Sequence, residues 1–143
     1  MTAWNDDAWA ESNAYDEAAL GADDEVQDDG PTTYYRSVDE FVREYLRHVY
    51  GCKIDGRTRV WAAEWWRYIG AVTRLEALWR AWEHLRLDGA TGISVWLRDH
   101  ADHHMNVLFD PAGPFEAADP LDEANHAMKG GPLPYAAPPA GLY

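Results

Sequence analysis

The side chains best able to do chemistry are concentrated in residues 98–104, which hold three histidines and two aspartates. If this segment is helical, His100 and His104 lie four residues apart on one face, a spacing that lets two imidazoles share a zinc ion. A third ligand could come from Asp99, Asp102 or His126. The candidate metal site is therefore His100, Asp102 and His104, with zinc as the metal.

A simpler interpretation competes with this metal site. Asp102 could cap a helix, leaving the histidines exposed or hydrogen-bonded in a loop. Zinc proteases place a glutamate directly after the first histidine of the pair, where this chain has Ala101. The expectation is therefore that no cofactor is bound, with zinc as the alternative.

Other catalytic signatures are missing from the sequence. Cys52 is the only cysteine, which excludes an intrachain disulfide and any zinc site of several cysteines. Lys129 is followed by two glycines but lacks the preceding glycine spacing of a phosphate-binding loop. Residues 92–96 fail the nucleophile-elbow pattern at its last position. These absences favour a non-enzymatic protein over a small metal-dependent enzyme.

The charge is concentrated at the N-terminus. Residues 1–30 hold ten acids and no lysine or arginine, or −10 of the net −13, and the rest holds fifteen acids and twelve bases, or −3. We expect a disordered acidic arm over residues 1–32. Trp4, Trp9 and Tyr15 alternate with the acids, a pattern typical of segments that dock on a partner. A solubilising tail is the other interpretation of the arm.

The composition favours another protein as the partner. The arginines of the central segment scatter around a helical wheel and form no basic stripe, so weak DNA binding masked by the acidic arm is only an alternative. No apolar run approaches the roughly 20 residues that cross a bilayer, and the first residues are acidic where a signal peptide is basic. We expect a cytoplasmic protein without membrane contact.

The first helix is clearly marked and should run from Val38 to Tyr50. Ser37 and Glu40 have the spacing of a capping box, and Asp39 and Arg43 can pair at i,i+4. Apolar residues then follow at spacings of three and four: Val38, Phe41, Val42, Tyr45, Leu46 and Val49. Gly51 is the expected stop after the helix.

A tryptophan-rich segment follows. Its apolar residues are Trp61, Trp65, Tyr68, Ile69, Val72, Leu75, Leu78, Trp79, Trp82 and Leu85. At about 100° per residue the first five and the last five point in directions roughly 80° apart, which predicts two helices, 58–69 and 71–87, meeting near Gly70. Trp61, Trp65, Trp79 and Trp82 should form the core. Trp66 lies off the stripe, so it either meets another element or marks a contact surface.

The sequence patterns for the remaining elements are less specific. Residues 93–100 are read as a helix, because no second strand is available to pair with them, and Asp102 should cap a last short helix. Residues 116–143 are rich in Pro and Gly and should lie extended on the domain or hang free. The expected fold is a small all-α domain of four to five helices over residues 33–115, between the acidic arm and a Pro/Gly-rich tail.

Residues 34–115 also carry a family pattern. It consists of Tyr35-Arg36-Ser37-Val38, Trp61 to Trp66, Arg74 to Glu83, Trp96, Arg98-Asp99-His100 and Gly113-Pro114-Phe115. This pattern resembles an actinobacterial family of domains of unknown function, family 4913. The resemblance implies a group often encoded with plasmid-transfer and other mobile-element genes, and it implies no activity. On this basis the expectation is an accessory interaction protein, with Trp66, Trp4, Trp9 and Tyr15 as candidate partner-binding residues.

Overall fold

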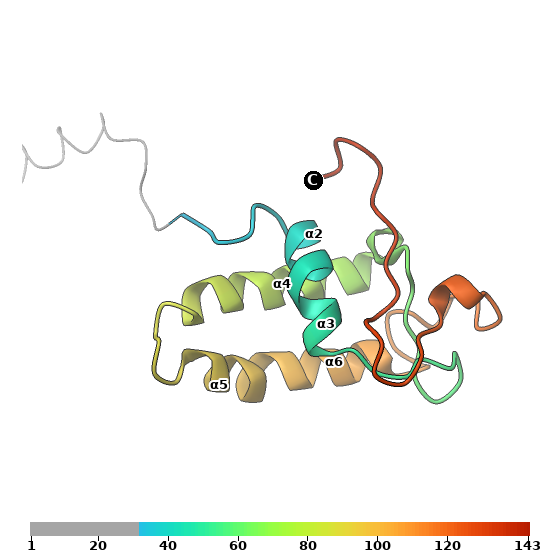
Figure 1. The fold of residues 1–143 in the computed structure, drawn as a ribbon. Coiled ribbons are helices and arrows are strands. Elements are labelled where there is room, and N and C mark those ends of the chain that lie inside the picture. The colour runs from blue at the N-terminus through green and yellow to red at the C-terminus, as the bar shows by residue number, and fades with distance from the viewer. Residues whose placement is uncertain (1–31) are drawn as a thin grey trace, which may run out of the picture. The chain divides into compact units, whose positions relative to one another are not determined.

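The computed structural model describes residues 32–143, and their regular structure is helical (Figure 1). The predicted all-α class is confirmed within this range, where the only strand-like pairing is an isolated antiparallel bridge between Ile54 and Ala127. The expected four to five helices are instead three continuous ones. None of the helices described in residues 32–143 is both long enough and apolar enough to cross a membrane.

The first continuous helix joins α2 (Val38–Phe41), a π-helical turn (Val42–Leu46) and α3 (Arg47–Val49), as predicted. The Ser37 hydroxyl oxygen accepts a hydrogen bond from the Glu40 amide at 3.2 Å, the expected N-cap. The Glu40 carboxylate accepts from the Arg36 amide at 2.7 Å, one residue before the position that a capping box uses. The cap therefore also holds the segment that enters the helix.

The predicted helix over 58–69 is wrong. Residues 58–64 are irregular, and a single 3-10 turn (Trp65–Arg67) precedes α4 (Ile69–Leu85). The backbone groups here bond distant partners: the Val60 amide donates to the Phe109 carbonyl at 3.0 Å, and the Ala63 amide to the Asn125 side chain at 2.9 Å. These long-range bonds replace the i→i−4 bonds of a helix. The break that the sequence placed at Gly70 lies at Tyr68, whose backbone is extended.

The third continuous helix joins α5 (Gly92–Trp96), a π-helical turn (Leu97–Ala101) and α6 (Asp102–Phe109). The helical interpretation of residues 93–100 is confirmed. The predicted cap at Asp102 is wrong, because helical backbone continues through it. The Asp102 carboxylate instead accepts a hydrogen bond from the Tyr50 hydroxyl at 2.7 Å, which ties this helix to the end of the first.

The helices α4 and α5–α6 run side by side, and the first helix lies against them (Figure 1). Trp96 is fully buried between them, and its indole nitrogen donates to the Leu78 carbonyl at 3.0 Å. Of the four tryptophans expected in the core, Trp61, Trp65 and Trp82 are buried and Trp79 is half-buried. The burial predicted for the tryptophan-rich segment is thus largely confirmed, although half of the segment is not helical.

The C-terminal segment lies on the helical body, one of the two arrangements that the sequence allowed (Figure 1). The Leu133 side chain is fully buried, and its amide donates to the Arg47 carbonyl at 2.9 Å. The Ala136 amide donates to the Ala63 carbonyl at 2.9 Å, and the Trp61 indole nitrogen donates to the Pro134 carbonyl at 3.1 Å. This segment therefore supplies partners to the irregular residues that precede α4.

Gly51 and Gly92 are among the glycines that lie close to the backbone of another segment. A Cβ at Gly51 would lie 2.7 Å from the Gly131 carbonyl oxygen, and one at Gly92 would lie 1.8 Å from the Leu85 carbonyl oxygen. Gly51 follows the first helix as predicted, but without the positive φ of a C-terminal glycine cap. Gly92 lets the start of α5 approach the end of α4.

We expect Gly92→Ala to lower the free energy of unfolding by about 1–3 kcal/mol, because the added methyl group overlaps a backbone carbonyl that cannot rotate away. Alanine has a higher helix propensity than glycine. A loss of stability in Gly92→Ala would therefore come from the steric overlap and not from helix propensity. Gly89→Ala is the matched control, since a Cβ there meets nothing within 4 Å. Urea unfolding of both variants measures the difference, and equal midpoints would contradict the close approach.

Candidate interaction surface

The chain turns sharply before α4, and the turn places one apolar side chain in solvent. The Trp65–Arg67 turn ends at Tyr68, which has φ −110° and ψ 103° and gives α4 no side-chain cap. Ile69 therefore occupies the first position of α4, and 81% of its surface is exposed. The apolar series of the sequence predicts that Ile69 lies on a buried stripe, and this prediction is wrong because the series assumes a helix that continues backward from Ile69.

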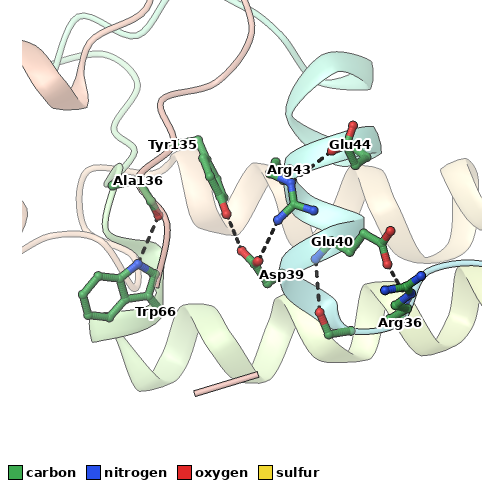
Figure 2. A network of polar contacts seen from close by, with 9 residues as sticks. Arg36, Asp39, Glu40, Arg43, Glu44, Trp66, Tyr135 and Ala136 are labelled. Carbon is green, nitrogen blue, oxygen red and sulfur yellow. Dashed lines mark hydrogen bonds and ion pairs between the residues drawn. The ribbon is translucent and has the colours of Figure 1, made fainter. Parts of the chain in front are cut away.

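Trp66 lies in the same turn and meets another element, as the first of its two interpretations predicted. Its indole nitrogen donates to the Ala136 carbonyl oxygen at 3.2 Å (Figure 2). The ring remains half-buried, and the Arg67 guanidinium carbon lies 5.3 Å from its centroid. Arg67 also pairs with Glu64 at 2.7 Å. Whether Trp66 also binds a partner stays a prediction.

A polar network holds the C-terminal segment beside Trp66. The Tyr135 hydroxyl donates to the Asp39 carboxylate at 2.6 Å, and Arg43 donates to the same carboxylate at 3.0 Å (Figure 2). The Asp39–Arg43 pair predicted from the sequence is therefore formed, and the Tyr135 hydroxyl bonds the same Asp39 carboxylate. Burial and the bond to Asp39 raise the pKa of Tyr135, so its hydroxyl stays a donor at neutral pH.

The side chains of the predicted histidine site contact different partners. His104 Nδ1 lies 2.9 Å from an Arg74 side-chain nitrogen, Asp102 accepts from Tyr50, and Asp99 is paired with Arg98. His126 Nε2 contacts the Pro120 carbonyl oxygen at 2.7 Å. Across residues 32–143 no three His, Cys, Asp or Glu side chains are grouped so that they could hold a metal ion. Zinc at His100, Asp102 and His104 stays a prediction of the sequence alone.

The contact with Arg74 fixes the protonation state of His104. Arginine can only donate, so Nδ1 must accept and the imidazole is neutral. Burial lowers the pKa of His104 from its ordinary value of 6.5, and the charges of Arg74, His103 and His100 lower it further. The native state therefore binds fewer protons than the unfolded chain just below pH 6.5.

We expect the stabilisation from neutral His104 to be complete above about pH 6.5 and to be lost as the pH falls through the lower, folded-state pKa. His104→Asn should reduce the loss of stability between about pH 7.5 and about pH 5.5, because the amide oxygen can accept from Arg74 without titrating. Urea midpoints at both pH values measure this, with the exposed His48→Asn as control. An unchanged pH dependence in His104→Asn would contradict the assignment.

Glu83 is the one charged residue that is buried in the described part of the chain. Its carboxylate accepts from the Tyr34 and Tyr35 amides at 2.8 and 3.0 Å, from the Trp79 indole at 3.1 Å and from Arg86 at 2.8 Å. Burial raises its pKa, but these donors outweigh burial and the pKa is lowered from 4.5. Glu83 thus fixes the segment that enters the first helix, a role that no sequence signal indicated.

We expect Glu83→Gln to lower the free energy of unfolding by about 2–3 kcal/mol, because an amide group would replace one acceptor oxygen and remove the negative charge that the Arg86 guanidinium contacts. The contribution of Glu83 is present above its unfolded pKa and is lost as the pH falls through its lower folded-state value. The variant should therefore differ from the parent near neutral pH and converge with it in acid. Glu76→Gln on the same helix is the control in urea unfolding, and a loss of equal size there would contradict the role of Glu83.

The arginines of the central segment have separate neighbours, as the wheel predicted. Arg59 lies over Phe109, Arg80 lies over Trp79, and Arg86 bonds Glu83. Among the predicted partner-binding residues, Trp4, Trp9 and Tyr15 lie outside the described residues.

Residues 35–139 match the family described as a domain of unknown function (DUF4913). The match covers most of the chain, and the protein belongs to this family. No curated protein matches the chain. No solved structure matches it either.

Proposed function

We propose that this chain is a non-enzymatic accessory protein that binds another protein through the surface at the start of α4. The observation that carries the proposal is Ile69, an isoleucine with 81% of its surface in solvent at the beginning of a helix. A single exposed apolar residue is ordinary. Here, however, it follows a half-buried tryptophan and an exposed arginine within three residues of the chain, and these are residue types enriched where binding energy is concentrated.

The position of Ile69 supports a specific contact. Trp66 is held by Ala136 and the Ile69 backbone by the first turn of α4, so neither has to be ordered on binding. A preformed anchor loses less conformational entropy on association than a mobile one. A partner could therefore cover Ile69 and the free edge of Trp66 without rearranging the fold.

The setting of this activity is proposed on the family resemblance. The sequence pattern resembles an actinobacterial group whose members are often encoded with plasmid-transfer and other mobile-element genes. An accessory role beside such machinery agrees with a small chain that presents a docking surface.

The test is capture of a partner from a lysate of the source organism by the immobilised full-length chain. We expect a protein retained by the parent to be lost with Ile69→Asp, because a buried carboxylate without a partner is strongly unfavourable in an interface. Leu87→Asp is the matched control, since Leu87 is also exposed, at 54%, and lies past the other end of α4. That end is roughly 24 Å away at 1.5 Å per residue.

Circular dichroism and urea unfolding must show that both variants keep the parental fold. A retained protein that both aspartate variants lose equally would contradict a specific surface at Ile69. The absence of any protein that distinguishes the parent from Ile69→Asp would contradict the proposed function itself.

A further inference from the structure

The end of the first helix, the turn at residues 58–59 and the end of α6 form the walls of a cleft of about 560 Å³. Its lining includes Cys52, Arg59, Asn106, Phe109 and Asp110, and we refer to it as the Arg59 cleft. Small-molecule sites span about 300–1,000 Å³, so the cleft has the size of such a site. It contains neither the surface proposed at the start of α4 nor the histidines of residues 98–104.

Backbone hydrogen bonds fix the two walls that carry the charged residues. The Val60 amide donates to the Phe109 carbonyl at 3.0 Å, which joins the residue after Arg59 to the end of α6. The Asp55 carboxylate accepts from the Arg59 amide at 3.3 Å and so holds the turn on which Arg59 lies. These walls are therefore preformed, and a ligand that enters the cleft loses little free energy in ordering them.

Arg59 provides a cation at the cleft. Its guanidinium carbon lies 5.9 Å from the centroid of the Phe109 ring, and that ring lies 5.6 Å from the centroid of Trp61. The ring thus positions the guanidinium. Within residues 32–143 the Arg59 side chain forms no hydrogen bond or ion pair. A planar guanidinium with unused donors fits a carboxylate, which accepts two parallel hydrogen bonds from it.

Asp110 provides the opposite charge. One of its carboxylate oxygens accepts from the Ala112 amide at 2.9 Å, which leaves the second oxygen able to accept from a ligand. Asp110 forms no ion pair with Arg59 or with any other residue in the described part of the chain. One turn earlier, the Asn106 side chain has no hydrogen-bond partner among residues 32–143 and adds both a donor and an acceptor.

We propose that the Arg59 cleft binds a small zwitterion with one carboxylate and one ammonium group, the chemistry of a free amino acid or a short peptide. The carboxylate bonds Arg59, and the ammonium group bonds Asp110. A ligand with only negative charge would gain Arg59 but approach Asp110, and a ligand with only positive charge would do the reverse. This inference is independent of the partner surface proposed at Ile69.

The test is an NMR titration of the full-length, ¹⁵N-labelled chain with glycylglycine and two singly charged analogues. N-acetylglycylglycine keeps only the carboxylate, and glycylglycine amide keeps only the ammonium group. We expect glycylglycine to shift the amides along the cleft, which are those of Cys52, Arg59, Asn106 and Asp110. Each analogue should bind about two- to fivefold more weakly, the size expected from the loss of one exposed charge pair. Glycine, whose two charges lie closer together, distinguishes a site for a free amino acid from one for a short peptide.

Two variants assign the two charges. Arg59→Gln should remove the preference for glycylglycine over its amide. Asp110→Asn should remove the preference over the N-acetyl analogue, and its amide oxygen can still accept from Ala112. Arg57→Gln is the matched control, because Arg57 is exposed on the same turn and does not line the cleft. Cys52 is the only cysteine, so slower alkylation by iodoacetamide at saturating glycylglycine reports occupancy of the cleft independently.

Absence of amide shifts along the cleft, or equal binding of glycylglycine and either analogue by the parent, would overturn the inference. So would loss of the preference in Arg57→Gln to the same extent as in Arg59→Gln, or alkylation of Cys52 that glycylglycine leaves unchanged. The comparison of the peptides uses the parent chain alone, and it therefore decides the question even where a variant fails to fold.

Discussion

The structure depends on one constraint, which is that residues 60–63 are buried without being helical. Their backbone groups cannot satisfy one another within a helix, and an unpaired buried amide costs about as much as a lost hydrogen bond. The partners come from far along the chain: Phe109, Asn125 and Ala136 each bond this stretch. The C-terminal segment must therefore lie on the body of the protein, because it supplies the groups that this buried segment lacks.

The same constraint determines where α4 begins. Since the chain arrives through a 3-10 turn and an extended Tyr68, the first helical residue is Ile69, and nothing precedes it on its own side of the helix. Had residues 58–69 formed a helix, Ile69 would have shared an apolar stripe with Trp61 and Trp65. The exposure of Ile69 thus follows from the way in which the preceding segment buries Trp61 and Trp65.

The parts of the fold that could be predicted are those that local patterns determine. Ser37, the Asp39–Arg43 pair and the apolar stripe specify the first helix, because caps and i,i+4 neighbours act within a few residues. The irregular stretch before α4 could not be predicted, since its tryptophans have nearly helical spacing and its true partners lie about 50 to 75 residues away. Glu83 was missed for a related reason: its burial arises from Tyr34 and Tyr35, which come from another segment.

Three sides of α4 contact other parts of the described chain. Leu75 and Leu78 face the core, Arg74 reaches His104 of α6, and Glu83 and Trp79 face the segment that enters the first helix. The remaining side is the one that carries Ile69 and Arg80. Within residues 32–143 this fourth side is uncovered, so the contact proposed at Ile69 would use a helix whose position is already fixed, which lowers the entropy lost on binding.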